Sequence, residues 1–378
     1  MNRRLTFLLL ALVTVFALAL TACAPAATPA PTEPPAPTQA PPPTTAPTEA
    51  PTAVPPTAAP PTPTPPPPPD CSKLSDAPAA PAAGALGSTD NPIVITFVPS
   101  GDTGKIAKAG GSIADCLSQM TGLSFKEEVG TSFAASVEAM GAEKAQVSFL
   151  NTAAALLAAN RYGVFPVLLA IRNYPTTAPD VDPDKTLAGQ PEPFYRGQFI
   201  ASVASGIKSF ADLKGKTFCF VDPASTSGYI MPRIVLKANG IDPDADFKST
   251  TNAGSHNNVA IAVYKGDCDA GSTYVNVLTD TSANLAATYP DIAQKVAPFA
   301  VTDRIPNDGM QFIKSLDPAL QKVIVEGMLK MAGDPGGKAV LKSLYNYDSL
   351  QQVPPTQYAD FLKVLEKAGI DPATLLPK

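Results

Sequence analysis

From residue 91 onward, short apolar runs alternate with stretches whose apolar positions recur at helical spacing. The short runs indicate strands, and the periodic stretches indicate amphipathic helices. Strands are predicted at 93–99, 123–129, 146–150 and 164–171, with helices between them at 112–120, 132–140 and 151–163. Strand and helix in alternation are typical of an α/β fold with parallel strands.

A second series of the same kind follows a proline-rich excursion at 172–194. A long strand at 195–203 is placed to cross between domains. Further strands are predicted at 216–222, 247–251, 272–278 and 295–301, with helices at 209–215, 228–239 and 255–265. Helices near 317–332, 335–345 and 355–368 end the chain and are expected to return to the first series. We therefore predict two α/β lobes, each a mostly parallel sheet with flanking helices, whose facing strand ends form a ligand cleft.

The N-terminus indicates where the lobes reside. Arg3 and Arg4 precede an apolar run at 5–20, and small residues follow it. This arrangement is typical of a secretory signal, and the end of it, LTAC at 20–23, resembles the bacterial lipoprotein signal. We predict a signal peptide at 1–22 and lipid on Cys23, with an uncleaved transmembrane helix as the alternative. Either way, the rest of the protein is expected outside the cytoplasm, anchored to the outer face of the membrane.

Residues 23–85 are predicted to be a disordered stalk. The segment 24–69 is almost entirely Pro, Thr and Ala, with Glu33 and Glu49 as its only charges. Such a composition cannot bury a core and favours an extended polyproline spacer. We interpret it as a tether that holds the lobes away from the membrane. A Pro-rich ligand for a partner protein is the alternative.

Charge and histidine content narrow the classes of partner. The chain has 378 residues and a formal net charge of −5, and charged residues make up 16% without clustering by sign. A nucleic-acid partner is not expected, because no basic patch is present. The single histidine and the cysteine spacing predict neither a metal site nor a cofactor.

Four cysteines lie beyond Cys23, and an exported protein can oxidise them in any of three pairings. Cys219 lies in a predicted strand, and Cys268 lies just before another. If these strands are parallel neighbours, both thiols lie at the same edge of the sheet. This favours Cys219–Cys268 and, by elimination, Cys71–Cys116, which would fasten the stalk to the first helix. Free buried thiols remain the alternative.

The turn DPASTSGY at 222–229 places three hydroxyls, Ser225, Thr226 and Ser227, between a strand and a helix. A helix N-terminus has unpaired N–H groups and partial positive charge, so hydroxyls there can hold an anion without Lys or Arg. Ser and Thr are also ordinary N-caps. A cap needs one hydroxyl, and the surplus here favours an anion site as much as a plain cap.

His256, the only histidine, begins another predicted helix. Its ring is either a satisfied structural group or a donor to the same ligand. A Ser–His–Asp hydrolase would need His256 as its base, and no motif positions the other members.

The segment 212–247, which contains DPASTSGY, and the segment 253–271, which contains AGSHNN, resemble the phosphate/phosphite/phosphonate-binding proteins of ABC importers. The segments 99–123 and 137–152 resemble the same family more loosely. The resemblance covers about 91–310 and implies a type II-like periplasmic-binding-protein fold whose lobes close on a ligand. Lobe 1 is expected at 86–200 and 303–378, and lobe 2 at 201–302.

The resemblance also implies the ligand-binding residues. The hydroxyls of Ser225, Thr226 and Ser227 and the ring of His256 would hold the oxyanion. Candidates from the first lobe and from the strand at 272–278 complete the set: Ser100, Asn151, Thr152, Tyr274 and Asn276.

One residue departs from the family pattern. Relatives that take aminoalkylphosphonates hold the amine with an acidic residue at about the place of Asn276, which is neutral. Asp280 and Asp303 lie nearby in sequence. We expect phosphate, phosphite or a small alkylphosphonate as the ligand, a monomeric receptor, and an ABC transporter permease as partner. Another small anion such as sulfate or a sulfonate, and a phosphate-ester hydrolase, are the alternatives.

Overall fold

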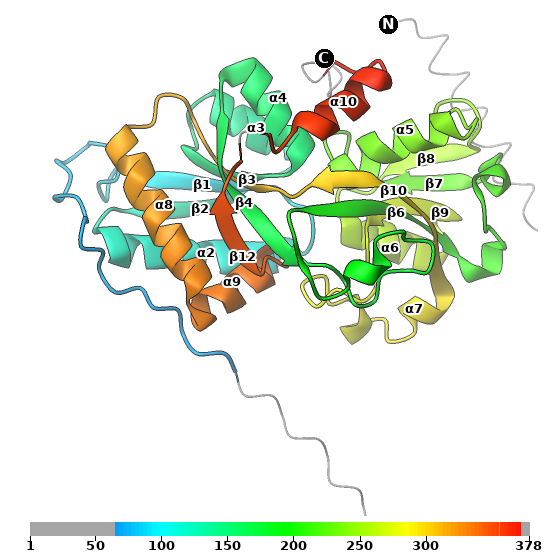
Figure 1. The fold of residues 1–378 in the computed structure, drawn as a ribbon, viewed down its shortest axis with the longest axis horizontal. Coiled ribbons are helices and arrows are strands. Elements are labelled where there is room, and N and C mark those ends of the chain that lie inside the picture. Colours follow the sequence, from blue (N-terminus) through cyan, green and yellow to red (C-terminus); the bar gives the residue numbers. More distant parts are fainter. Residues whose placement is uncertain (1–64, 355, 372–378) are drawn as a thin grey trace, which may run out of the picture. The chain divides into compact units, whose positions relative to one another are not determined.

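The computed structural model describes residues 65–354 and 356–371. All of them lie in one compact unit, which contains two sheets flanked by helices (Figure 1). The predicted signal peptide, Cys23 and the stalk up to residue 64 lie outside the described residues. Within the described part of the chain, no helix has both the length and the apolar character needed to cross a bilayer.

The first lobe is built on a sheet with the strand order β12-β4-β11-β3-β1-β2, with β5 paired to β4. Its strands are β1 (Ile93–Phe97), β2 (Phe125–Val129), β3 (Val147–Leu150), β4 (Phe165–Asn173), β5 (Pro191–Glu192), β11 (Gly309–Phe312) and β12 (Ser349–Gln352). Its helices are α2 (Thr103–Thr121), α3 (Phe133–Gly141), α4 (Thr152–Tyr162), α8 (Pro318–Gly333) and α9 (Pro335–Tyr345). Figure 1 shows α3 and α4 on one side of the sheet and α2, α8 and α9 on the other. The central strands β1 and β3 are therefore apolar and almost fully buried.

The second lobe is built on a sheet with the order β10-β6-β9-β7-β8. Its strands are β6 (Phe194–Ser202), β7 (Thr217–Phe220), β8 (Ser249–Asn252), β9 (Ala270–Tyr274) and β10 (Val296–Pro306). Its helices are α5 (Met231–Ala238), α6 (His256–Lys265) and α7 (Ile292–Lys295), and the π-helical turn η4 (Thr226–Ile230) leads into α5. The last helix, α10 (Ala359–Lys367), was expected on the first lobe. Instead, its Phe361 and Leu365 pack over the junction, against apolar residues of both lobes.

The prediction of mostly parallel sheets is wrong, because both sheets are mixed. In the first sheet, β1 pairs in parallel with β2 and β3, whereas β4, β11 and β12 pair antiparallel. In the second sheet, β7 pairs in parallel with β8 and β9, whereas β6 pairs antiparallel with β9 and β10. The antiparallel pairings involve the strands that lead into or out of the two chain crossings between the lobes. The sequence pattern missed β11 and β12, which have only four residues each.

The chain crosses between the sheets twice. The first crossing lies between β4 and β6, and the second is the short link from β10 to β11. The expected lobe limits at 200/201 and 302/303 fall inside β6 and β10, and both strands belong entirely to the second sheet. The chain therefore enters the second lobe before Phe194 and leaves it after Pro306.

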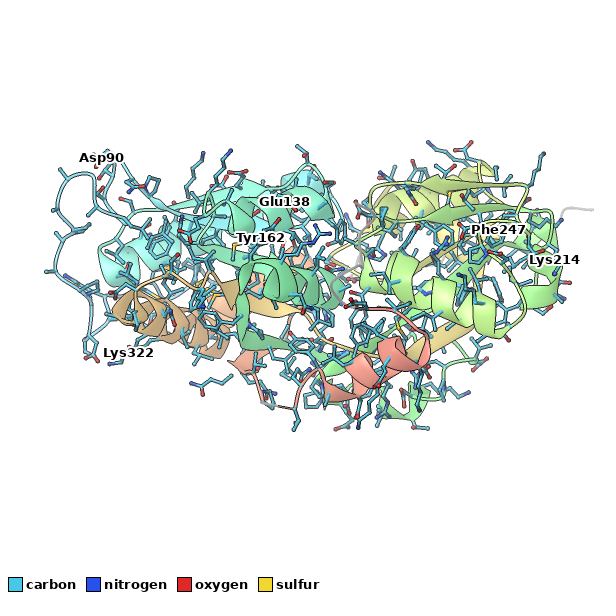
Figure 2. All side chains as sticks on the ribbon, turned by 90° about the horizontal axis from the view of Figure 1, so that it is seen from above. Asp90, Glu138, Tyr162, Lys214, Phe247 and Lys322 are labelled. Carbon is cyan, nitrogen blue, oxygen red and sulfur yellow. A yellow bond between two sulfur atoms is a disulfide. The ribbon has the colours of Figure 1, made fainter. Side chains whose placement is uncertain are left out.

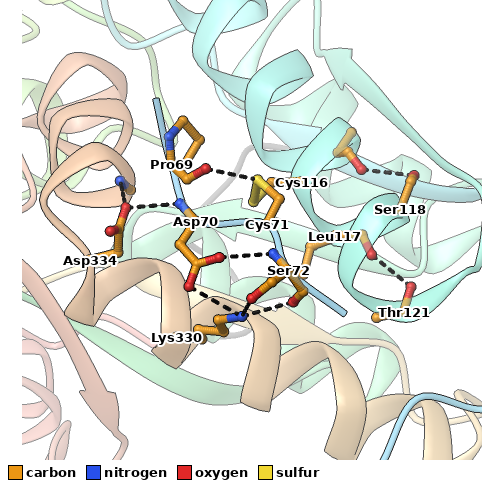
Figure 3. Close-up of a disulfide and its surroundings, with 12 residues drawn as sticks. Pro69, Asp70, Cys71, Ser72, Cys116, Leu117, Ser118, Thr121, Lys330 and Asp334 are labelled. Carbon is orange, nitrogen blue, oxygen red and sulfur yellow. Dashed lines mark hydrogen bonds and ion pairs between the residues drawn. A yellow bond between two sulfur atoms is a disulfide. The ribbon is translucent and has the colours of Figure 1, made fainter. Parts of the chain in front are cut away.

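Both predicted disulfides are confirmed. Cys219–Cys268 joins β7 to the residues before β9, its parallel neighbour. Cys71–Cys116 joins the segment before the first lobe to α2. Figure 3 shows that this segment is also held at Asp70, whose amide donates to Asp334 Oδ2 at 3.1 Å. The expected stalk limit at residue 85 is therefore too late, since contacts with the lobe begin near residue 70.

Many of the charged side chains lie at the outer surface of each lobe. Figure 2 shows Lys322 and Asp90 at the end of the first lobe away from the second, and Lys214 at the far end of the second lobe. Lys322 Nζ pairs with Asp76 at 2.9 Å and Lys214 Nζ with Asp246 at 3.3 Å, both near solvent. The charges that matter for a ligand are therefore the few at the junction.

Candidate functional site

A cavity of about 100 Å³ lies between the lobes. Its walls come from the loop between β1 and α2, the end of β4, the start of η4, the start of α6, the end of β9 and the link from β10 to β11. Nearly all of these are carboxyl ends of strands, where α/β sheets place their ligands. The size suits a ligand of a few non-hydrogen atoms.

The lobes touch each other around the cavity. Backbone and side-chain groups of the first lobe meet those of the second across the junction. The contacts are Ala153 N to Thr226 Oγ1 (3.0 Å), His256 N to Ser100 O (3.0 Å) and Lys105 Nζ to Ser282 O (3.2 Å). The structure therefore represents a closed arrangement.

The three hydroxyls of the predicted turn do not share one role. Ser225 caps η4, because its Oγ accepts the amide of Gly228 at 3.2 Å, and the hydroxyl proton stays available. Ser225 and Ser227 are buried and line the cavity. The Thr226 hydroxyl points to the start of α4 and accepts the amide of Ala153, so Thr226 is not among the lining residues. Pro232 lies in the first turn of α5, directly after the π-turn, where the missing N–H of proline is tolerated.

His256 lies at the first position of α6, which Ser255 caps. Its Nδ1 accepts the amide of Tyr274 at 3.3 Å. Burial lowers the pKa of His256 to about 3, so the ring is neutral near pH 7. A neutral ring whose Nδ1 accepts carries its proton on Nε2. The ring lines the cavity and can donate there.

Tyrosine side chains surround these donors. Burial raises the pKa of Tyr195 to about 12, while hydrogen bonds from Ser227 and Thr226 act in the opposite direction. Burial likewise raises the pKa of Tyr345 well above its usual range, and its hydroxyl donates to Val98 O at 2.7 Å. Both phenols therefore stay protonated. We call Ser100, Ser225, Ser227 and His256 the donor wall, since each offers an O–H or N–H without formal charge.

Another part of the cavity lining, formed by Arg172 and Asp308, is charged, and sequence reasoning missed it. Arg172, at the end of β4, lies 2.6 Å from Asp308 Oδ1 and donates to Asn307 Oδ1 at 2.7 Å. Tyr347 donates to Asp308 Oδ2 at 2.7 Å, and the guanidinium lies over its ring. Burial disfavours the charged guanidinium, but Asp308 outweighs it, so the pKa of Arg172 is raised. We call Arg172, Asn307, Asp308 and Tyr347 the crossing wall, because three of them flank the chain crossings.

Only one of these residues had a signal in the sequence. Arg172 directly follows the predicted strand at 164–171. Asp308 had none, because the strand predicted at 295–301 stops before it, whereas β10 runs to Pro306. Polar residues immediately after a strand are the positions that α/β folds use for ligands.

The remaining predicted residues divide into two groups. Ser100, Asn151, Tyr274 and Asn276 line the cavity together with Ser225, Ser227 and His256. Thr152 does not, because its hydroxyl donates to Pro306 O at 2.6 Å in the buried junction. Of the two nearby acids, Asp280 is buried and lines the cavity, whereas Asp303 is exposed and does not.

The catalytic alternatives find little geometric support. Nδ1 of His256 accepts a backbone amide, so it does not donate to a carboxylate as the histidine of a Ser–His–Asp triad does. Within residues 65–354 and 356–371, no group of three or more His, Cys, Asp or Glu side chains is placed to hold a metal ion. The arrangement offers hydrogen bonds to an anion rather than an activated nucleophile.

Comparison with protein families gives one match along most of the chain. The model of the periplasmic phosphonate substrate-binding proteins of ABC transporters matches residues 95–358. That range includes both walls of the cavity.

Individual relatives are more distant. The chain is 26% identical over 214 residues to "Phosphate-import protein PhnD" of Mycolicibacterium smegmatis, covering 55% of this chain and 61% of that protein. It is 31% identical over 189 residues to "Phosphonates-binding periplasmic protein" of Escherichia coli, covering 47% of this chain and 54% of that protein. The matches thus span between half and two thirds of these relatives.

Solved structures show the same fold. A binding protein of an ABC phosphonate transporter from Pseudomonas aeruginosa superimposes with a TM-score of 0.63 at 22% identity, over 73% of this chain and 86% of that one. PhnD1 from Prochlorococcus marinus, in complex with methylphosphonate, gives 0.60 at 16% identity, over 73% and 98%. At these identities the likeness establishes the fold of two lobes.

Proposed function

Because the chain belongs to the periplasmic phosphonate substrate-binding proteins of ABC transporters, we propose that it captures a phosphorus oxyanion outside the cytoplasm. Phosphonate, phosphite and phosphate are the members of this class that we consider. Closed lobes holding the anion would then be presented to an ABC transporter permease.

The donor wall is the observation that carries the proposal. Ser225 has a hydroxyl proton to give, and His256 is held neutral with its proton on Nε2. The Ser227 hydroxyl would turn from Tyr195 to the ligand. These donors line one small cavity, at the ends of strands and at helix starts. Oxyanions accept several such hydrogen bonds at once, and helix starts favour their negative charge.

The energies agree with a transport receptor. A hydrogen bond to a charged group contributes ~1.5–3 kcal/mol. Four or five of these, less the loss of ligand freedom, give binding near −8 kcal/mol, which corresponds to micromolar affinity.

Isothermal titration calorimetry of the purified chain tests the proposal. We expect micromolar 1:1 binding of methylphosphonate, phosphite or phosphate. A clear preference for sulfate or ethanesulfonate would move the protein to another anion class. Turnover of a chromogenic phosphate ester would favour a hydrolase. Absence of binding to every phosphorus oxyanion would overturn the proposed function.

We also propose that the protein is a lipoprotein, cut after residue 22 and lipidated on Cys23. The LTAC sequence at 20–23 and the Pro-rich tract after it support this. The tract would link the lipid to the segment that Cys71–Cys116 fastens to the first lobe. In cells that produce the full chain, Cys23→Ser should abolish incorporation of labelled fatty acid and release the protein from the membrane fraction. Unchanged labelling would refute the anchor.

A further inference from the structure

The carboxylates of the cavity bear on which oxyanions enter. Three of them line it: Asp102, Asp280 and Asp308. A ligand that carries an ammonium group needs one of them as a partner, because a buried unpaired charge is costly. Asp102 is exposed and caps α2 by accepting the amide of Lys105 at 2.9 Å. Whether a ligand with an ammonium group can bind therefore depends on the two buried carboxylates, Asp280 and Asp308.

Asp308 already has a cation. The Nη2 atom of Arg172 lies 2.6 Å from Oδ1, a close ion pair that is off the hydrogen-bond line, and Tyr347 donates to Oδ2 at 2.7 Å. The guanidinium cannot easily move away, because it also donates to Asn307 Oδ1 at 2.7 Å and to the carbonyl of Tyr345 at 3.2 Å. The Arg172 guanidinium thus occupies the position beside Asp308 that the ammonium group of a ligand would need.

Asp280 is engaged in a similar way. Its Oδ1 accepts the amide of Ser282 at 2.8 Å and the Ser282 hydroxyl at 2.9 Å. The negative charge of this carboxylate also adds to the rise in the pKa of Tyr274 that burial causes. The ammonium of Lys105 donates to the carbonyl of the same Ser282 at 3.2 Å. Asp280 is thus held by hydrogen bonds from Ser282, which itself contacts a lysine, whereas Asp308 pairs directly with a guanidinium.

The positive charge of Arg172 also acts on two tyrosines that line the cavity, Tyr195 and Tyr274. The guanidinium lies 5.3 Å from the ring centre of Tyr195, whose hydroxyl reaches Ser227. Burial raises the pKa of Tyr274 well above its usual range, and the positive charge of Arg172 acts against this rise. Arg172 therefore influences residues beside the donor wall as well as its own partner.

We propose that Arg172 is a specificity-determining residue that excludes phosphorus oxyanions carrying an ammonium group. The inference rests on the proposed function and narrows its ligand class to oxyanions with a neutral substituent. An ammonium beside Asp308 would face the guanidinium at short range, where like charges repel strongly because little water screens them. A hydroxyl of the same size is neutral and escapes this penalty.

The test compares 2-hydroxyethylphosphonate with 2-aminoethylphosphonate by calorimetry on the purified chain, with methylphosphonate as reference. The two ligands match in size and differ in charge. We expect the hydroxyl ligand to bind at least tenfold more tightly. Equal affinities, or tighter binding of the amine, would overturn the inference. Failure of all three ligands to bind would instead reject the proposed function.

Variants locate the effect at Arg172. Arg172→Met removes the cation at similar length and should reduce the hydroxyl-to-amine ratio at least tenfold, whereas Arg172→Lys should retain a preference for the hydroxyl. An unchanged ratio in Arg172→Met would overturn the inference. If that variant does not fold, Asp308→Asn serves in its place. It leaves Arg172 without its counter-ion and should raise the ratio further, and a fall would contradict the inference.

Discussion

The donor wall lines the cavity, and the crossing wall reaches it through Arg172 and Asp308, but the two walls bury polar groups in opposite ways. Ser225, Ser227 and His256 are neutral donors, and Ser225 and His256 keep a proton to give. Arg172 and Asp308 are charged and are already paired with each other. Unused donors can contribute free energy to a ligand, whereas charges that already have partners cannot do so without breaking an existing pair.

The contrast separates affinity from selection. A buried ion pair contributes little net stability, because the lost hydration offsets its attraction. Removing one partner is costly, since it leaves a buried charge alone. We therefore expect changes in the donor wall to alter ligand affinity, and changes in the crossing wall to alter folding stability and ligand choice.

The largest effect is expected when both donor-wall serines are removed. Ser225→Ala combined with Ser227→Ala deletes two hydrogen bonds to a charged ligand, each contributing ~1.5–3 kcal/mol. Affinity for methylphosphonate should fall about a hundredfold or more, measured by calorimetry. Ser112→Ala, on the surface of α2 with its hydroxyl on Lys108 O, is the matched control. A loss below fivefold in the double variant would contradict the donor role.

A substitution in the crossing wall should mainly lower the free energy of unfolding. Tyr347→Phe leaves the buried Asp308 without its donor and should lower the free energy of unfolding by ~1–3 kcal/mol, measured by urea denaturation. Affinity for methylphosphonate should change less than threefold, since Tyr347 does not line the cavity. The control is Tyr162→Phe, whose hydroxyl makes the same bond to Glu138 at 2.7 Å on the surface (Figure 2). Equal destabilisation by both variants would contradict the expectation that the buried hydrogen bond contributes more stability than the surface one.

Thr226 should affect ligand affinity only indirectly, because its hydroxyl joins the two lobes and does not line the cavity. Thr226→Val should weaken methylphosphonate binding about tenfold by making the closed arrangement less populated. Small-angle scattering with saturating ligand should still show the closed form. Thr250→Val, on the exposed strand β8, should leave affinity unchanged. If Thr226→Val binds as the unmodified chain does, the contact between the lobes does not contribute to closure.

The smallest effect concerns pH. The folded-state pKa of His256, about 3, lies below the ordinary value of 6.5. Between these values the unfolded chain binds a proton that the folded chain does not, so stability is complete above pH 6.5 and falls as the pH decreases. The loss from this group should be on the order of 1 kcal/mol between pH 6.5 and 5.5. His256→Gln should have a correspondingly flatter profile in urea denaturation, and parallel profiles would refute the burial of a neutral ring.

Much of the fold was predictable because it depends on neighbours along the chain. The helical period of α2 and its stop at Gly122, whose φ is 75°, are local properties. The caps Asn151 and Ser255 bond amides within their own first turns. Even the pairing of Cys219 with Cys268 followed from two adjacent strands.

The candidate site was predictable on one side only. The hydroxyl turn and His256 could be found because their residue types match the chemistry of an anion. The crossing wall could not, because Arg172 and Asp308 belong to distant segments that meet only where the chain crosses between the lobes. The direction of the strands beside those crossings was missed for the same reason.

The amino-acid sequence was sufficient for the two α/β series, the disulfides and the hydroxyl-rich turn at the start of η4, because short-range spacing specifies them. Only the tertiary structure decided that Thr226 turns away from the cavity and that the Arg172 guanidinium pairs with Asp308. The first outcome depends on a contact between the lobes, and the second on the pairing of β4 with the distant strand β11. No local period or cap encodes either of them.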